Sequence, residues 1–359
     1  MTERMQSRRM ASHLLGLGLG LLGCGATKND AGAKMSCSDW AALQDGGGVP
    51  AGSGTVAEQR ASLLAAGGGI ATVGTKYYVT YFPAAFATSA RKRVLVNLHG
   101  TGGSPEAEWN DFRASLDARG WGFLGLKYLD DATGFYDDDE TIYANLVAAV
   151  QEARSGCDLA SAQLFLFGFS RGSAKTFAMA YLDNRGERLF TAFGSSSGGA
   201  WQQPSDCAWT TGGGACAWQP ADPLFPSECA LGSAPASSCA CDSFVSGVAP
   251  AKAQKPSFAQ TILAQRDAAA YAGSSFWAYC GERDYHDGYR QCGDMEMSKV
   301  FVEAFGGRVD ELYAAGSADG CVPWAGTTCI ASVDTRCGHG SLKNQAAAWG
   351  RMWSYFESL

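Results

Sequence analysis

The feature that most constrains the fold of this chain is an apolar run that leads directly into a glycine-flanked serine. Residues 163–169 read Gln-Leu-Phe-Leu-Phe-Gly-Phe, with hardly a polar interruption. A strand with one solvated face alternates apolar and polar residues, whereas a continuous run predicts a strand that is buried on both faces. Residues 174–182 then have helical spacing. The sequence therefore predicts a buried strand, a tight turn and a helix.

Strand-like and helix-like segments alternate along much of the chain. This alternation predicts a mostly parallel central sheet with helices on both faces, the α/β class. The expected strands are 77–82, 93–98, 122–128, 163–169, 189–193, 275–279 and 309–313, and the expected helices are 141–153, 174–182, 296–305 and 345–356.

The alternation breaks between residues 201 and 256. This stretch is rich in Gly, Pro and Ser, and it contains Trp201, Trp209, Trp218 and five cysteines. We interpret it as a Cys-rich insert, or lid, in a main domain that spans 67–359. Because five is an odd number, at least one of these cysteines is expected to pair outside the insert or to stay free.

The first 23 residues have the features of a bacterial export signal. Arg4, Arg8 and Arg9 give a positive start, and an apolar stretch follows over 14–22. The sequence Leu21-Leu22-Gly23-Cys24 resembles a lipobox, so Cys24 is the predicted lipid-attachment residue and the membrane is a predicted partner. The alternative is ordinary signal cleavage, with Cys24 there by chance.

The residues after Cys24 predict where the protein is found. Gly25 stands where an Asp often signals retention at the inner membrane, so we favour the outer membrane over the inner one as the site of a lipid-anchored protein of the cell envelope. A secreted, extracellular protein is the alternative. No apolar run reaches the roughly 18 residues that span a bilayer. Residues 24–66 are rich in Gly and Ala and predict a tether with irregular structure, fastened through Cys37.

The cysteine spacing and the net charge argue against a metal site and against a nucleic-acid-binding protein. Of 13 cysteines, removal of Cys24 leaves twelve, an even number that allows up to six disulfides in an exported protein. The close pairs Cys239-x-Cys241 and Cys337-x-His339 lack the spacing of zinc ligands, so we expect neither metal nor cofactor. A net charge of -7 argues against nucleic acid as a partner.

Two segments match the G-x-S-x-G pattern of a nucleophile elbow, in which a serine is exposed at a sharp turn from strand to helix. Ser170, in 168–172, ends the apolar run and opens the helical segment. Ser196, in 194–198, leads into Trp201 and Pro204 with no helix after it. Context therefore selects Ser170 as the candidate nucleophile, and a plain helix N-cap is its alternative role.

A Gly-rich segment follows the expected strand 93–98. His99-Gly100-Thr101-Gly102-Gly103 resembles the HGGG-type segment that supplies a main-chain N–H to an oxyanion hole. Thr101 is the predicted donor, with Gly102 as the alternative, and the Arg171 N–H is the predicted second donor. The competing interpretation is a simple turn after a strand.

An acid and a base complete the candidate site. Asp284 follows the strand 275–279, with Glu282 and Asp287 as competitors for the role of orienting acid. His339 is the predicted base, because it lies between the last expected strand and the last expected helix. The other histidines are His13 in the export signal, His99 in the Gly-rich segment, and His286 in an expected loop. Cys337 is expected to fasten the loop that carries His339.

The order Ser170, Asp284, His339 resembles that of the α/β-hydrolase superfamily, and the resemblance covers about residues 75–359 apart from the insert. It implies a serine hydrolase that cleaves carboxylic esters, small or polymer-linked, through an acyl-enzyme. Trp side chains in the insert would suit sugar rings or aromatic acids. Arg171 departs from the smaller residue usual after the nucleophile; we expect it to form a salt bridge.

Other functions use the same residues. A polyester depolymerase, a peptidase or an acyltransferase would carry the same triad. A non-catalytic surface binding protein on this fold is the alternative from another class, and the loss of a triad member would favour it.

Overall fold

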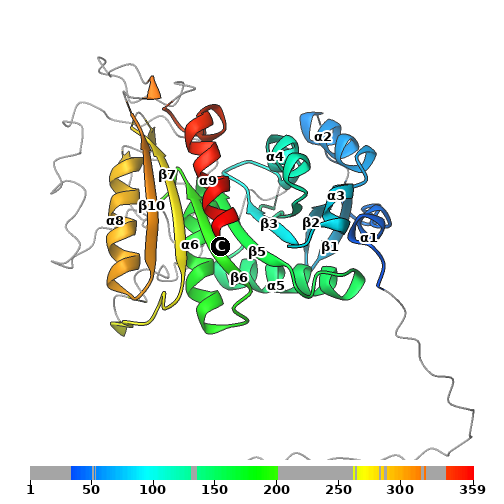
Figure 1. The fold of residues 1–359 in the computed structure, drawn as a ribbon, viewed down its shortest axis with the longest axis horizontal. Helices are drawn as coiled ribbons and strands as arrows, with labels where there is room; N and C mark the ends of the chain where they lie inside the picture. Colours follow the sequence, from blue (N-terminus) through cyan, green and yellow to red (C-terminus); the bar gives the residue numbers. More distant parts are fainter. Residues whose placement is uncertain are drawn as a thin grey trace, which may run out of the picture. The chain divides into compact units, whose positions relative to one another are not determined.

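Eight strands pair into one sheet, in the order β1-β2-β4-β3-β5-β6-β7-β10 (Figure 1). The computed structural model describes residues 34–50, 52, 54–130, 136–200, 262, 265–282, 284–286, 289–316, 319–320 and 337–359. The strands are β1 (Gly69–Val73), β2 (Lys76–Tyr81), β3 (Arg93–Leu98), β4 (Gly122–Leu126), β5 (Gln163–Phe169), β6 (Phe190–Ser196), β7 (Ser275–Gly281) and β10 (Arg308–Ala315). A separate hairpin joins β8 (Tyr285–His286) to β9 (Tyr289–Arg290).

The sheet is mostly parallel, as the alternation of elements predicts. The six strands from β4 to β10 pair in parallel, and β1 and β2 form an antiparallel hairpin at one edge. In parallel strands the carboxyl ends meet at one edge of the sheet, where open α/β folds place their sites. The hairpin partner β1 is not among the strands expected from the sequence.

The central strand β5 shows why its sequence is apolar throughout. Leu164 and Leu166 belong to the core on one face of the sheet, and Phe165 and Phe167 belong to the core on the other. All four side chains are buried. Because successive residues of a strand point to opposite faces, a strand covered on both sides needs apolar residues at every position.

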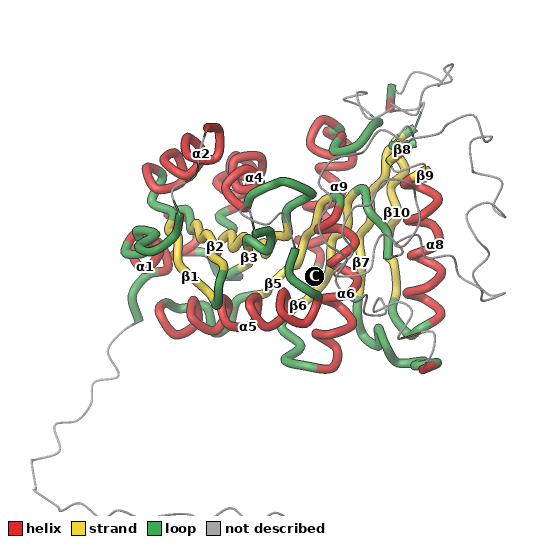
Figure 2. The backbone as a smooth tube through the Cα atoms, turned by 180° about the vertical axis from the view of Figure 1, so that it is seen from behind, coloured by secondary structure: helices red, strands yellow, loops and turns green. Residues whose placement is uncertain are grey.

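Helices cover both faces of the sheet, as Figure 2 shows from behind. Two apolar cores separate the helices from the strands: Leu146 and Phe177 lie in one, and Trp109 and Trp353 lie in the other. The helices after β2 are α3 (Ala84–Thr88), α4 (Pro105–Arg119), α5 (Asp139–Gly156), α6 (Arg171–Arg185), α8 (Gln291–Ala304) and α9 (Ala346–Ser358).

The N-terminal part of the compact unit, which begins at Met35, contains helices rather than the irregular structure expected to residue 66. They are α1 (Cys37–Ala42) and α2 (Gly54–Ala65). Ser36 caps α1, since its hydroxyl accepts a hydrogen bond from the Asp39 N–H at 3.2 Å. Short helices rich in Ala and Gly carry little apolar periodicity, so their packing decides their structure.

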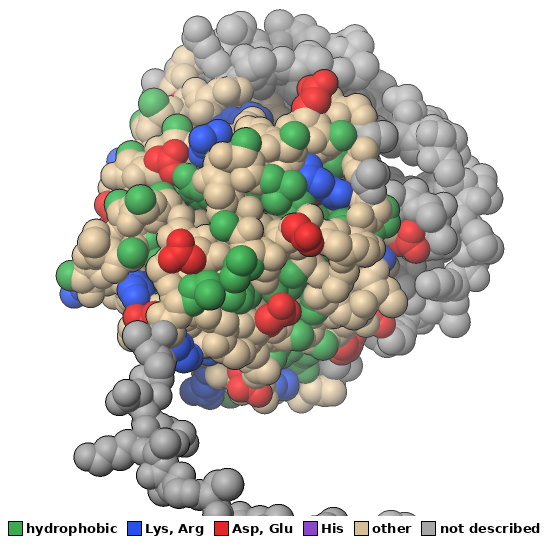
Figure 3. All heavy atoms as spheres, turned by 90° about the vertical axis from the view of Figure 1, so that its right-hand side faces the viewer, with side chains coloured by type: hydrophobic (Ala, Val, Ile, Leu, Met, Phe, Trp, Pro, Cys, Tyr) green, Lys and Arg blue, Asp and Glu red, His purple; other side chains and the backbone are tan. Residues whose placement is uncertain are grey.

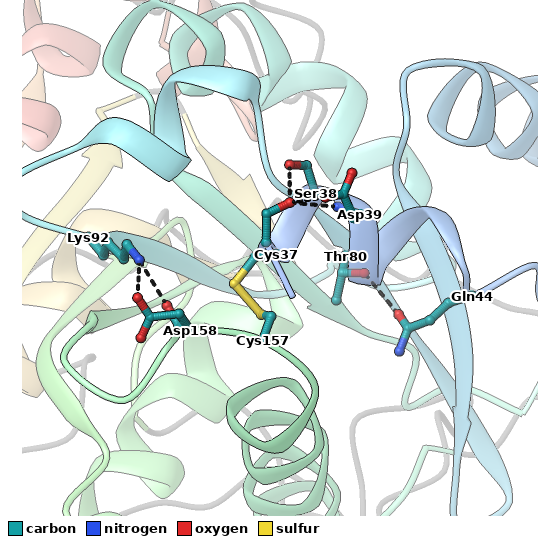
Figure 4. The surroundings of a disulfide bond; sticks show 9 residues. Cys37, Ser38, Asp39, Gln44, Thr80, Lys92, Cys157 and Asp158 are labelled. Carbon is teal, nitrogen blue, oxygen red and sulfur yellow. Dashed lines mark hydrogen bonds and ion pairs between the residues drawn. A yellow bond between two sulfur atoms is a disulfide. The ribbon is translucent and has the colours of Figure 1, made fainter. Parts of the chain in front are cut away.

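A disulfide fastens this N-terminal part, as expected for Cys37. Figure 4 shows Cys37 of α1 bonded to Cys157, the C-cap residue of α5, across 120 residues of sequence. Nearby, the Thr80 hydroxyl of β2 donates to the Gln44 side chain at 3.1 Å, which attaches the segment after α1 to the sheet.

Every cysteine in the described part of the chain is disulfide-bonded. Cys280 at the end of β7 pairs with Cys292 in α8, and Cys337 is disulfide-bonded as well. These bonds agree with the use of cysteine that the sequence predicts. The predicted export signal, Cys24 and the predicted insert 201–256 lie outside the described residues.

The surface seen in Figure 3 mixes acidic and basic side chains with apolar ones. Exposed large apolar side chains include Leu43, after α1, and Leu64, in α2. No helix in the described ranges combines the length and apolar character that a membrane span requires.

Candidate active site

Ser170 stands at the junction of β5 and α6 in a strained backbone conformation. Its φ of 54° and ψ of -117° lie where glycine is favoured over residues with a side chain. The sharp turn needs close packing around it: a Cβ on Gly168 would lie 2.0 Å from the Gly172 carbonyl oxygen. The G-x-S-x-G pattern therefore forms the strand-to-helix turn that the sequence predicts at this serine.

The structure brings Ser170, His339 and Asp284 into one chain of hydrogen bonds. The Ser170 Oγ lies 2.8 Å from the His339 Nε2. The His339 Nδ1 lies 3.0 Å and 3.1 Å from the two carboxylate oxygens of Asp284. Asp284 is fully buried, so its carboxylate can hold the ring with Nδ1–H toward itself and leave Nε2 as acceptor for the serine proton.

A tight turn after β7 places Asp284. Its N–H donates to the Gly281 carbonyl at 2.9 Å. A Cβ on Gly281 would lie only 2.0 Å from the Cys337 carbonyl oxygen, so glycine allows this strand end to approach the loop that carries His339. The competitor Glu282 is exposed, and its N–H pairs with Ala315 in the neighbouring strand. The other competitor, Asp287, lies outside the described residues.

The imidazole of His339 is supported from several sides. The Phe169 ring, next to the serine, lies 5.0 Å from the imidazole between centroids. After His339 the chain turns through Gly340, which has a φ of 75°, into the short helix η3 (Ser341–Asn344). There the Ser341 hydroxyl lies 2.7 Å from the Tyr279 hydroxyl of β7. These contacts fix the loop between Cys337 and α9.

The Gly-rich segment after β3 lies beside the serine. A Cβ on Gly172, the second residue of α6, would lie 2.0 Å from the Leu98 carbonyl oxygen. The Gly102 N–H is occupied, since it donates to the Tyr136 hydroxyl at 2.7 Å. Within the described part of the chain the Thr101 N–H has no hydrogen-bond partner. The geometry therefore favours Thr101 over Gly102 as an oxyanion donor.

Arg171 begins α6, and the first N–H groups of a helix point out of its N-terminal end. Its side chain is buried although it is charged. The guanidinium lies over the Tyr136 ring, 4.0 Å from the centroid, and its Nε donates to the Thr101 hydroxyl at 3.4 Å. The sequence predicts a salt bridge for this side chain, which stays a prediction; the contacts described here join it to an aromatic ring and a hydroxyl.

We compared the chain with known proteins. No protein-family model matches the sequence, and no curated protein matches it. An esterase of Pyrococcus furiosus has a similar structure, with 11% sequence identity and a TM-score of 0.50, over 86% of this chain and 97% of that one. The chain has an α/β-hydrolase fold.

Other solved structures match with lower scores. The esterase Est1E of Butyrivibrio proteoclasticus, with ferulic acid bound, has 14% identity and a TM-score of 0.44 over 79% of this chain and 98% of that one. A fungal esterase of Rhizomucor miehei has 14% identity and a TM-score of 0.48 over 80% of each chain.

The second serine pattern takes a different place in the α/β-hydrolase fold. Ser196 ends β6, and its carbonyl accepts the Ser170 N–H at 2.8 Å. Its hydroxyl is buried and has no hydrogen-bond partner in the part of the chain that the structure describes. No described histidine is hydrogen-bonded to that hydroxyl, and the Ser196 main chain supports the turn at Ser170.

Burial changes the pKa of other titratable residues near the site. His99 is fully buried and stacks on Tyr128; burial lowers its pKa to about 3, so its ring is neutral at pH 7. Burial also raises the pKa of Glu108 in α4 to about 8, with repulsion from Asp111 as a smaller cause. The His286 side chain is not among those described, and His13 precedes the described residues. Among those residues no group of His, Cys, Asp and Glu is placed to hold a metal ion.

The sequence did not reveal Tyr136. This residue accepts the Gly102 N–H and underlies the Arg171 guanidinium. It lies between Phe135 and a run of acidic residues, with no motif around it. Only the fold brings it to the Gly-rich segment, which follows a different strand.

Proposed function

We propose that this chain is a serine hydrolase that cleaves carboxylic esters through an acyl-enzyme. The observation that carries the proposal is the hydrogen-bonded series Ser170, His339 and Asp284 at the carboxyl end of a parallel sheet. The α/β-hydrolase fold, which also occurs in the Pyrococcus furiosus esterase, supports this assignment.

The proposed reaction has two halves, acylation and deacylation, and the same groups act in both. The Ser170 Oγ attacks the ester carbonyl carbon, and its proton passes to the His339 Nε2. The N–H groups of Thr101 and Arg171 stabilise the oxyanion that forms, an effect worth a factor of about 10²–10³ in kcat for one donor in other enzymes. His339 then gives the proton to the leaving alkoxide as the carbon–oxygen bond breaks. A water molecule then attacks the acyl-enzyme carbonyl while His339 takes its proton. The bond to the Ser170 Oγ breaks, His339 returns the proton to that oxygen, and the carboxylic acid is released.

A fluorophosphonate probe tests the nucleophile. We expect the wild type to be labelled at Ser170, because the probe reacts with an activated serine and mimics the tetrahedral intermediate. Ser170→Ala should abolish labelling, and His339→Ala should reduce it strongly. The matched control is Ser196→Ala, which removes the serine of the second pattern and should leave labelling unchanged. Labelling that persists in Ser170→Ala, or that is absent from the wild type, would contradict the proposal.

A panel of chromogenic esters of graded acyl length, with feruloyl and acetyl sugars, tests the reaction class. Ester hydrolysis that Ser170→Ala removes supports the proposal. Turnover confined to peptides, polyesters or acyl transfer to an alcohol would assign the site to a different reaction of the same triad. A labelled enzyme without any turnover on these substrates would favour a binding protein.

We further propose that the protein is exported and held at the cell envelope by a lipid on Cys24, in line with the export signal and the disulfides. Expression of the full chain in bacteria with an alkynyl fatty acid tests this. The wild type should incorporate the lipid, and Cys24→Ser should not. Equal incorporation by the two proteins, or none by the wild type, would contradict the anchor.

A further inference from the structure

The Arg171 side chain is buried, although its position next to the nucleophile does not require this. As the first residue of α6 it would contribute to catalysis by its N–H alone, and any side chain could follow. Its guanidinium is nevertheless folded into the protein, with 5% of the residue exposed. Charged side chains are seldom buried to this degree unless specific partners hold them.

Two contacts of this side chain link it to the segment that carries the other proposed donor. The Arg171 Nε donates to the Thr101 hydroxyl at 3.4 Å. The guanidinium carbon lies over the Tyr136 ring, and the hydroxyl of the same tyrosine accepts the Gly102 N–H at 2.7 Å. Arg171 therefore contacts the Gly-rich segment directly at Thr101 and indirectly, through Tyr136, at the next residue.

Other contacts fix the two ends of this segment but leave its middle to Arg171 and Tyr136. The Tyr128 hydroxyl donates to the His99 carbonyl, and the Lys127 Nζ donates to the Gly103 carbonyl at 3.1 Å. The turn is closed by the Gly103 N–H, which donates to Gly100 at 3.1 Å. Thr101 itself is exposed. The hydrogen bond from Arg171 joins its side chain to the rest of the site.

We propose that the Arg171 side chain, with Tyr136, is a positioning device that holds the Thr101 N–H toward the oxyanion. This inference rests on the proposed function. One residue then supplies the first donor through its main chain and fixes the second through its side chain, so the spacing of the two donors follows from a single rigid unit. Arginine suits this task because its planar group stacks on an aromatic ring while its Nε–H remains directed at an acceptor.

Steady-state kinetics on an ester of the panel test the inference. Arg171→Met keeps the length of the side chain and removes both contacts. We expect kcat to fall about 10- to 100-fold, because small misplacement of a reacting geometry has effects of this size. KM should change by less than about threefold, since the Thr101 donor acts on the transition state rather than on bound substrate. The rate of fluorophosphonate labelling should fall in parallel.

Two milder variants test the individual contacts. Thr101→Val removes the hydroxyl that accepts from Arg171 but keeps the main-chain N–H, and Tyr136→Phe keeps the ring but removes the hydroxyl. Each should lower kcat less than Arg171→Met does. The double variant Arg171→Met/Thr101→Val should be no slower than about the Arg171→Met variant, because both changes break the same link. These variants carry the test if Arg171→Met fails to fold.

Arg185→Met is the matched control. Arg185 lies on the same helix and stacks on the Tyr181 ring at 3.9 Å, far along the chain from the Gly-rich segment. Its loss should leave kcat within about twofold of the wild type. Methylguanidinium should restore part of the kcat of Arg171→Ala and none to Ser170→Ala, a rescue that a general loss of stability would not give.

The outcomes separate this inference from the proposed function. Folded Arg171→Met with wild-type kcat, or with a raised KM and unchanged kcat, would overturn the positioning role alone. The same holds if the Thr101→Val and Arg171→Met losses multiply in the double variant. Ester hydrolysis that survives in Ser170→Ala would instead overturn the proposed function.

Discussion

Ser170 has a backbone conformation that glycine adopts more readily than any residue with a Cβ. Strain of this kind costs on the order of 1–3 kcal/mol, and glycine brings an entropic cost of about 0.5–1 kcal/mol. We therefore expect Ser170→Gly to be more stable than Ser170→Ala by about 1 kcal/mol, although both lack the hydroxyl. Urea unfolding of the two variants measures the difference. An alanine variant as stable as the glycine variant would show that the turn is not strained.

His99 shows how burial couples a neutral histidine to stability. Its Nδ1–H donates to the Gly100 carbonyl at 2.8 Å, and burial lowers the folded-state pKa to about 3. The unfolded pKa is about 6.5, so the unfolded chain takes up a proton first as the pH falls. The stability that neutral His99 contributes is present above about pH 6.5 and is lost as the pH falls toward 3.

Unfolding in urea between pH 3.5 and 7.5 checks this prediction. The free energy of unfolding should decrease on acidification, and His99 should contribute up to about 1.4 kcal/mol per pH unit inside that window. His99→Asn retains an N–H that can donate to the same carbonyl but does not titrate, so its slope should be shallower. Equal slopes for wild type and variant would mean that His99 is charged or exposed in the folded protein.

Residue identities differ in how far the sequence could determine them. Ser170 was predictable because one strand and one helix flank it directly. Asp284 could be narrowed only to three acids within six positions, since the turn after β7 decides which carboxylate faces inward. The burial of Asp284 and the exposure of Glu282 come from the path of that turn.

At the scale of elements, apolar continuity predicts boundaries better than any motif. The structure places β3 at Arg93–Leu98 and β5 at Gln163–Phe169, the ranges expected from the sequence. Both strands are buried on two faces, so each strand follows a mainly apolar run and begins at the polar residue just before it. The helix α4 was not expected, although Ser104 caps its start and Gly120 ends it. Most of its residues are polar, so the few apolar residues that enter the core, such as Trp109, do not form a clear helical pattern in the sequence.

A substitution at the start of α6 tests how closely this helix approaches β3. Replacement of a helical glycine by alanine normally stabilises a helix by about 1 kcal/mol. At Gly172 the new Cβ would lie 2.0 Å from the Leu98 carbonyl of β3. We expect Gly172→Ala to lower the free energy of unfolding by about 1–3 kcal/mol and to lower kcat, because α6 must move away from the Gly-rich segment.

The control for this prediction is Gly350→Ala in the middle of α9, where a Cβ meets nothing within 4 Å. This variant should be more stable than the wild type by about 0.5–1 kcal/mol. Thermal or urea unfolding of the two proteins gives the comparison. A Gly172→Ala variant that gains stability as Gly350→Ala does would contradict the close approach of α6 and β3.

For the whole molecule, the topology of the sheet brings distant residues to one edge. Ser170 and Asp284 follow strands separated by one other strand in the sheet, and His339 reaches them from a loop before α9. The sequence predicts the shared edge because parallel strands end there. It cannot predict distances, which depend on loop paths and on close contacts such as Gly281 with Cys337. Nor could it predict how Tyr136 meets Arg171.

Two disulfides close loops of very different length, and this difference gives a further prediction. Cys37–Cys157 closes a loop of 120 residues and joins α1 to the end of α5, whereas Cys280–Cys292 closes 12 residues and holds the end of β7 just before Asp284. In the chain-entropy model, loops of about 100 and about 15 residues correspond to about 4.7 and about 3 kcal/mol. Replacement of the first pair by serine should therefore destabilise the protein more than replacement of the second.

Activity should respond in the opposite order. Cys37→Ser/Cys157→Ser should keep kcat near the wild-type value at temperatures where the protein stays folded, because α1 packs mainly against α3, α5, β1 and β2, none of which carries a site residue. Cys280→Ser/Cys292→Ser should lower kcat, since the turn that carries Asp284 begins one residue after Cys280. Urea unfolding and ester kinetics on both double variants, with reduced wild type for comparison, measure the two effects. If the long-range pair proves the less stabilising one, loop closure does not govern the stability of this fold; if kcat is unaffected by loss of the short-range pair, the position of Asp284 is fixed by other contacts, such as the hydrogen bond from its N–H to the Gly281 carbonyl.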